Sequence, residues 1–155
     1  LNEIIYGIHK KLSGGKEELV IRYEPDEETE GFENALERAR ERDIRMKITS
    51  VGPHRDDFAF LIDGIDVRKY GSQGQQRSTA LVMKLAQAKI IRDQTGEAPV
   101  MLLDDVLSEL DRDRQRFILR NIDDMQVFIT CCDSRVLDGT EGKIFSVSGG
   151  RITEG

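Results

Sequence analysis

The segment from Val100 to Asp105, with the sequence VMLLDD, constrains the fold more than any other part of the chain. Four consecutive apolar residues are typical of a strand that is buried on both faces, as in a parallel sheet covered by helices. Two carboxylates, those of Asp104 and Asp105, follow at the end of this strand. Because open α/β sheets bind ligands at the carboxyl ends of their strands, the segment predicts a ligand site as well as a sheet.

The rest of the chain alternates helical patterns with strand patterns, which predicts an α/β fold with parallel strands. Apolar residues at helical spacing predict helices over residues 1–12, 32–45, 75–93 and 112–122. Apolar runs and alternation predict strands over residues 19–23, 48–51, 58–62, 65–67, 100–103 and 127–129, followed by a hairpin over residues 143–153.

The beginning of the sequence and its composition set further expectations. Leu1 already belongs to the first helical pattern, with no initiator methionine and no capping residue before it, so we expect this helix to start upstream in a longer protein. The adjacent Cys131 and Cys132 do not form a disulfide framework, and together with the absence of a signal peptide they favour a reduced, cytoplasmic protein. No apolar run is long enough to cross a bilayer, so no membrane partner is expected.

The net charge of −6 argues against a chain dominated by a nucleic-acid-binding surface. It leaves room for contact with DNA through a local basic patch, or through parts of a longer protein.

The two carboxylates after the apolar run are suited to metal and water chemistry. Neighbouring strand residues point to opposite sides, so Asp104 and Asp105 can perform different tasks. Mg²⁺ is usually held by one or two carboxylates together with phosphates and waters, which suits Asp104, while Asp105 could polarise an attacking water. An acidic loop at a strand end is the structural alternative. A calcium loop begun at Asp111 fails, because Arg116 stands where its sharp turn needs glycine.

A glycine- and amide-rich loop over residues 71–78, GSQGQQRS, opens the predicted long helix. Glycines let backbone N–H groups approach a phosphate, and the helix N-terminus adds positive potential. The side chains of Ser72 and Gln75 are further donors. A glycine-containing helix cap is the structural alternative.

A P-loop, G-x-x-x-x-G-K-[ST], is missing from the sequence. At the Gly15-Lys16 step, Lys10 replaces the first glycine, and the turn ends a helix, so we interpret it as a C-cap. At the Gly142-Lys143 step, Leu137 stands at the first-glycine position. The chain therefore carries acids for metal and water but no primary cradle for a triphosphate.

Together these motifs resemble the C-terminal half of an ABC-type ATPase head. Residues 71–75 resemble its signature motif, residues 100–105 its Walker B strand, and residues 108–111 its D-loop. More closely, the chain is similar to the RecF family of DNA replication and repair proteins, which are related to SMC heads. The similar stretches are GPHRDD (52–57), YGSQGQQRS (70–78), LLDDVLSELD (102–111) and QVFIT (126–130), with the weaker IHKKLSGG (8–15) and LVIRY (19–23).

The resemblance implies a division of the chain. Residues 48–155 are expected to form the C-terminal part of an ABC-type head, with buried, largely parallel strands and helices. Residues 1–47 are expected to form part of the family's smaller α+β lobe, as a helix, a strand and a helix.

The resemblance also implies a shared nucleotide site. In ABC-type heads two subunits sandwich ATP, and the signature loop of one contacts the γ-phosphate held by the other. Carried over, Ser72, Gly74 and Gln75 would reach ATP in trans, and Asp104 would hold Mg²⁺. Asp105 would be catalytic, in the place where many such ATPases have glutamate, which is compatible with slow, switch-like turnover.

The D-loop and its surroundings carry fewer implications. Ser108 and Asp111 would bridge to the opposite subunit, although Asp111 could equally be the N-cap of the next helix. Many ABC heads have a switch histidine where Thr130 and Cys131 stand here. The resemblance assigns no role to His54 or Arg55.

The family's biology implies the partners. ATP would close a homodimer on DNA, single-stranded, double-stranded or gapped, and the recombination mediators RecO and RecR would act with it. The chain alone is expected to be inactive without a P-loop. The alternative is a non-catalytic SMC-like scaffold whose loop and acids dock a partner protein, and a P-loop upstream of Leu1 would decide against it.

Overall fold

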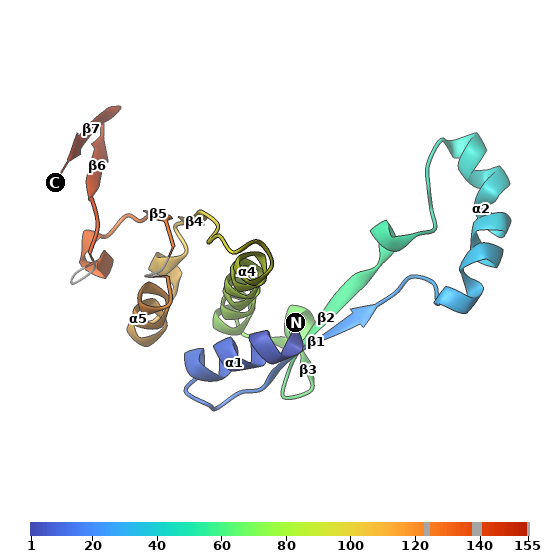
Figure 1. Ribbon diagram of the computed structural model, residues 1–155, viewed down its shortest axis with the longest axis horizontal. Coiled ribbons are helices and arrows are strands. Elements are labelled where there is room, and N and C mark those ends of the chain that lie inside the picture. The colour runs from blue at the N-terminus through green and yellow to red at the C-terminus, as the bar shows by residue number, and fades with distance from the viewer. Residues whose placement is uncertain (123–124, 138–140, 155) are drawn as a thin grey trace. The chain divides into compact units, whose positions relative to one another are not determined.

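The computed structural model describes residues 1–122, 125–137 and 141–154 (Figure 1). The chain forms two compact units, Leu1–Thr95 and Gly96–Gly155. Among the described residues no helix has the length and apolar character needed to cross a membrane.

The first unit begins with helix α1, Asn2–Leu12. Its buried residues Ile5, His9 and Leu12 recur every three to four positions, so they share the face that packs against β1 and α4. The helix ends at Ser13, and the backbone N–H of Gly15 donates to the carbonyl of Lys10 at 2.7 Å. Gly14 and Gly15 both have positive φ, which confirms the interpretation of this turn as a helix end and not as a phosphate loop.

Strand β1, Leu19–Glu24, pairs antiparallel with β2, Asp57–Ile62, from Leu19 opposite Ile62 to Glu24 opposite Asp57. The turn at Asp63-Gly64, with both residues at positive φ, joins β2 to the short β3, Ile65–Asp66. In Figure 1 β1 and β2 run side by side, with α1 near one end and α2, Phe32–Met46, at the other. This pairing joins segments that are about forty residues apart in sequence.

The predicted strand over residues 48–51 is wrong. Lys47 ends α2 in the left-handed conformation, and the N–H of Ile48 donates back to the carbonyl of Asp43 at 3.1 Å. The Asp43 carboxylate then accepts from the N–H of Ser50 at 2.8 Å, and Val51 packs against Ala35 and Ala39. The segment looks like a strand because it is apolar and β-branched, but its backbone groups bond to α2 instead of to a sheet.

The two compact units meet in sequence between Thr95 and Gly96, whereas the expected division lies between residues 47 and 48. Strand β1 from the predicted smaller lobe pairs along its whole length with β2 from the predicted head, and the first unit extends to Thr95. The change in sequence character near Lys47 marks the end of α2, which is a local feature. The assignment of the segments to a smaller lobe and a head stays a proposal about the longer protein.

The first unit ends with two helices that carry the glycine-rich loop between them. Helix α3, Val67–Tyr70, has only four residues and was not predicted. Helix α4, Gln73–Thr95, has 23 residues and begins two residues earlier than expected. Its buried residues cover several sides, as the sequence predicted, and they are Ser78, Thr79, Leu81, Val82, Leu85, Ala86 and Ala88.

The second unit contains a parallel strand pair joined through a helix. Strand β4, Met101–Asp104, pairs in parallel with β5, Val127–Thr130, and α5, Arg112–Arg120, lies between them in sequence. This arrangement confirms the α/β prediction with parallel strands. Strands β6, Phe145–Ser148, and β7, Arg151–Glu154, form the predicted C-terminal hairpin.

The prediction that β4 is buried on both faces is wrong for this chain. Met101 and Leu103 are buried, whereas Leu102 between them is 74% exposed, and Phe128 on β5 is exposed as well. A strand is covered on both faces only when helices lie on both sides of its sheet. In the described residues β4 pairs with β5 alone, and the outer face of the pair stays uncovered.

Candidate functional site

The signature-like loop, residues 71–75, joins α3 to the first turn of α4. Gly71 has an ordinary φ, but a Cβ at this position would lie 2.6 Å from the carbonyl oxygen of Val67 and 2.9 Å from its Cγ1. The N–H of Gly71 donates to that same carbonyl at 3.0 Å, which closes α3. Glycine is therefore required here by the close approach of the preceding helix.

We expect Gly71→Ala to destabilise the chain by about 1–3 kcal/mol, because the added methyl group forces the α3 backbone to move. Urea unfolding of the purified chain measures this change. Gly7→Ala is the matched control, since nothing lies within 4 Å of a Cβ there and alanine is the better helix former. Equal midpoints for Gly71→Ala and the wild-type chain would contradict the steric argument.

Ser72 and Gln75 form a reciprocal capping box at the start of α4. The Gln75 N–H donates to Ser72 Oγ at 3.2 Å, and the Ser72 N–H donates to Gln75 Oε1 at 2.9 Å. In this pair Ser72 Oγ acts as acceptor, so its own hydroxyl proton is still available to a ligand. The helix-cap alternative is thus correct as a description of the loop, and it leaves Ser72 exposed with a donor to offer.

The backbone around this cap favours an anion. The first N–H groups of any α-helix have no partner within the helix, and its dipole adds positive potential at that end. Gly74 lies in the first turn of α4 and has no side chain to cover these groups. Residues 72–75 therefore present the chemistry that a phosphate needs.

Residues of the GPHRDD turn hold α3, and through it the loop. The Arg68 guanidinium donates to both carboxylate oxygens of Asp57, at 2.6 and 2.9 Å, and these hydrogen bonds lower the pKa of that carboxyl. Asp66 caps α3 by accepting from the N–H groups of Arg68 and Lys69, at 2.9 and 3.2 Å. Asp57 therefore ties α3 to the start of β2.

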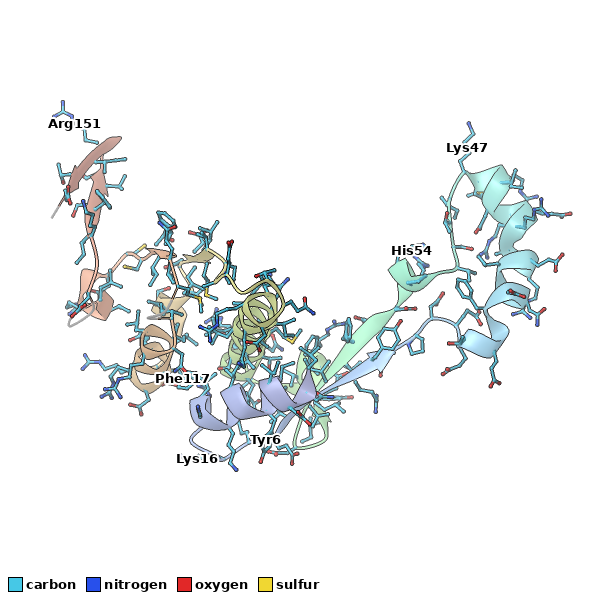
Figure 2. The ribbon with its side chains drawn as sticks, in the orientation of Figure 1. Tyr6, Lys16, Lys47, His54, Phe117 and Arg151 are labelled. Atoms are coloured by element: carbon cyan, nitrogen blue, oxygen red, sulfur yellow. The ribbon has the colours of Figure 1, made fainter. Side chains whose placement is uncertain are left out.

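The other residues of that turn have structural partners too. Asp56 accepts from the Tyr23 hydroxyl and, at 2.9 Å, from the N–H of Asp26. The hydrogen bond raises the pKa of Tyr23 and is the largest cause of the lowered pKa of Asp56. His54, labelled in Figure 2, bonds through Nε2 to the carbonyl of Thr49 at 2.8 Å. These contacts favour the structural interpretation of the turn for His54; Arg55 is exposed.

In the second unit, Thr130 joins Asp104, the predicted metal ligand, and Asp105, the predicted catalytic acid. Thr130 lies opposite Asp104 in the β4–β5 register, and its hydroxyl donates to Asp104 Oδ1 at 2.5 Å. The N–H of Asp105 reaches the hydroxyl oxygen of Thr130 at 3.0 Å and its carbonyl at 3.2 Å. Asp105 itself has φ +50°, in the left-handed region.

Sequence reasoning gave Thr130 no function, although a signal was present. Thr130 directly follows the apolar run 127–129, as Asp104 follows the run 100–103. Two parallel strands in matching register bring such end residues together.

The D-loop-like segment continues from these acids. Ser108 donates through Oγ to the carbonyl of Asp105 at 2.9 Å. Asp111 accepts from the N–H groups of Asp113 and Arg114, at 3.1 and 2.9 Å, which confirms the N-cap alternative for this residue. Gln115 closes the turn by donating to the carbonyls of Leu107 and Leu110.

Asp104 fits a magnesium ion that is held mainly by substrate and water. Its carboxylate is exposed at the end of β4, and Thr130 occupies one of its oxygens, which leaves Oδ2 available. Within the described residues no group of three or more His, Cys, Asp or Glu side chains could hold a metal. Mg²⁺ commonly binds through one or two carboxylates plus phosphates, so the donor set suits Mg²⁺ bound with a nucleotide.

The structure groups the predicted residues into two sets. Ser72, Gly74 and Gln75 lie in the first compact unit, and Asp104, Asp105, Ser108 and Asp111 lie in the second.

Comparisons with known proteins agree with the family suggested by the motifs. No family model matches the chain. The DNA replication and repair protein RecF of Lachnoclostridium phytofermentans is 56% identical over 131 residues, which are 84% of this chain and 36% of that protein. The recombination mediator protein RecF with ATP, from the RecFOR pathway, is 35% identical, with a TM-score of 0.74 over 99% of this chain and 44% of the solved one.

A solved SMC ATPase is similar in fold, with a TM-score of 0.57 at 17% identity, over 99% of this chain and 81% of the other. The chain spans less than half the length of the RecF proteins it matches. Over the residues that it contains, the chain belongs to the RecF family of DNA replication and repair proteins.

Proposed function

We propose that the chain is the C-terminal part of an ATP-dependent DNA-binding ATPase of recombinational repair and replication, and that it supplies two different halves of a shared nucleotide site. The signature-like loop serves an ATP gripped by the P-loop of a second subunit. Asp104 and Asp105 serve the ATP of their own subunit, whose P-loop lies outside this chain.

The observation that carries the proposal is the capping box at the start of α4. It fixes Ser72 at the helix N-terminus with its hydroxyl exposed, and Gly74 keeps the first turn open. A loop built in this way binds a phosphate that approaches from outside the molecule. The similarity to RecF solved with ATP supports a nucleotide as the source of that phosphate.

The residues of the second unit then have distinct tasks. Asp104 holds Mg²⁺, which neutralises charge on the phosphates when it is bound. Asp105 accepts a proton from the attacking water or orients it. Ser108 holds the backbone of Asp105, and Asp111 starts α5 so that the segment between them faces a second subunit.

The proposal extends to partners. ATP closes a homodimer on DNA, and RecO and RecR act with the dimer, in keeping with the RecFOR pathway from which the similar structure comes. Because the net charge of this chain is −6, we expect DNA to contact a local basic patch or other parts of the longer protein.

A trans-complementation experiment tests the shared site. In a full-length protein carrying these residues, Ser72→Arg and Asp104→Ala are each expected to be nearly inactive. Mixing them should restore part of the ATPase activity, because each mixed dimer keeps one intact site of its two.

The mixture distinguishes the two geometries of the signature loop. If Ser72 acts on the ATP of its own subunit, every site in the mixed dimer contains one defect and no activity returns. Mixing Ser72→Arg with a Ser72→Arg, Asp104→Ala double variant is the control, since no intact site can form in it.

The isolated chain of 155 residues is expected to hydrolyse ATP at a negligible rate, because the sequence holds no P-loop to grip the triphosphate. Phosphate release measured with the purified chain and Mg²⁺ checks this expectation. Turnover that Asp104→Ala abolishes would contradict it, since such turnover must come from the chain itself.

A further inference from the structure

Glu17 connects the turn after α1 to the signature-like loop, 58 residues further along the chain. Gln75 Nε2 donates to Glu17 Oε1 at 3.0 Å, in a half-buried position. The other carboxylate oxygen of Glu17 lies 3.7 Å from Nε2 of His9, which is 1% exposed. Figure 2 labels Lys16, the neighbour of Glu17, in this turn. The turn after α1, which superficially resembles a phosphate loop, thus contacts the signature-like loop through Glu17 and Gln75.

The backbone around Glu17 is fixed on both sides. Before it, the turn is closed by the hydrogen bond from the Gly15 N–H to the carbonyl of Lys10. After it, the N–H of Glu18 donates to Asp63 Oδ1 at 3.0 Å, and Leu19 begins β1. Glu17 therefore offers a carboxylate from a defined place instead of from a mobile loop.

The geometry of the Gln75 amide explains what this carboxylate does. The capping box closes only when Oε1 of Gln75 faces the N–H of Ser72, because two donors cannot bond to each other. In that orientation Nε2 points to Glu17, whose carboxylate can only accept. A flip of the amide would break both hydrogen bonds at once, so Glu17 selects the orientation in which the cap forms.

We propose that Glu17 is a positioning residue for the signature loop, and that it acts through the Gln75 amide to hold Ser72 ready for the ATP of a second subunit. The inference rests on the function proposed above. It makes Gln75 a structural intermediary whose amide oxygen and nitrogen both bond within its own subunit, and it leaves Ser72 and the backbone of α4 to meet the phosphate.

The test compares Glu17→Ala, Glu17→Gln and Glu18→Ala in a full-length protein. Glu18→Ala is the matched control, because it removes the same charge from the adjacent, exposed position. Two quantities are measured, the affinity of the monomer for ATP and the protein concentration at which ATP drives half of the molecules into dimers.

Glu17→Ala should raise that protein concentration about tenfold, as expected for the loss of a hydrogen bond to a charged group, and should leave the ATP affinity of the monomer unchanged. Glu17→Gln keeps an oxygen that accepts from Gln75 and should stay within about twofold of the wild type. A purely structural defect would lower monomer ATP binding as well. Wild-type dimerisation by Glu17→Ala would overturn the proposal.

A double-mutant cycle isolates the route through Gln75. Glu17→Ala added to Gln75→Ala should weaken dimerisation no further, whereas additive effects would show that Glu17 acts elsewhere and would overturn the proposal. If Glu17→Ala does not fold, Glu17→Asp replaces it, since it keeps the charge but withdraws the acceptor. Normal ATP-driven dimers of Ser72→Arg would instead count against the proposed function itself.

Discussion

Ser72→Arg in a full-length protein is expected to abolish ATP-driven dimerisation. Ser72 is exposed at the N-terminus of α4, where its small side chain both caps the helix and leaves room for a phosphate. Arginine adds a long side chain at that surface and removes the cap, which costs about 1 kcal/mol of helix stability. Light scattering with and without ATP measures the loss of dimers.

Ser72→Ala separates these two effects, because it removes the cap and the hydroxyl without adding bulk. It should weaken dimerisation only in part, and the ATP affinity of the Ser72→Arg monomer should match the wild type. If Ser72→Arg forms normal dimers with ATP, the loop does not face the phosphate of a second subunit.

Asp104→Ala is expected to lower the Mg²⁺-dependent ATPase rate of the full-length protein by about 100-fold or more, since metal stabilisation of transition-state charge contributes several kcal/mol. The steady-state rate at saturating ATP measures this loss. Asp113→Ala is the matched control. It removes the same charge from an exposed position on α5, where the carboxylate forms a surface ion pair with the Arg116 guanidinium.

A rate for Asp104→Ala within a few-fold of the wild type would show that another group holds the metal. The comparison at several Mg²⁺ concentrations sharpens the result. If Asp104→Ala only weakens Mg²⁺ binding, its rate recovers at high Mg²⁺ concentration, and a rate that stays low shows a loss that added metal cannot offset.

Local sequence signals were sufficient for most elements of the fold. Glycine turns, apolar periodicity and the Asp63-Gly64 hairpin signal predicted α1, α2, α4 and the β2–β3 turn, because each depends on residues close in sequence. The segment 48–51 misled because its composition suits a strand, while the Asp43 side chain and the left-handed Lys47 turn it back along α2. The strand propensity of a residue does not include a side chain that competes for the backbone N–H groups, as Asp43 does here.

The parts of the candidate site that depend on local motifs could be predicted from the sequence. The contacts between residues far apart in the sequence could not. The positions of Ser72 at a helix start and of Asp104 at a strand end follow from the sequence around them. The contacts of Thr130 with Asp104, and of Glu17 with Gln75, join segments 26 and 58 residues apart. A single sequence contains no record of which distant residues meet, so both partners emerged only from the structure.

The left-handed backbone at Asp105 has a consequence for the catalytic role proposed for this residue. Among residues with a side chain, aspartate and asparagine adopt this conformation most readily, because their short polar groups can bond to the nearby backbone. The shorter acid is therefore matched to the shape of the chain at this point. Installing glutamate at this position to obtain a faster enzyme would also require a change in the turn after β4. We expect Asp105→Glu alone not to raise the rate.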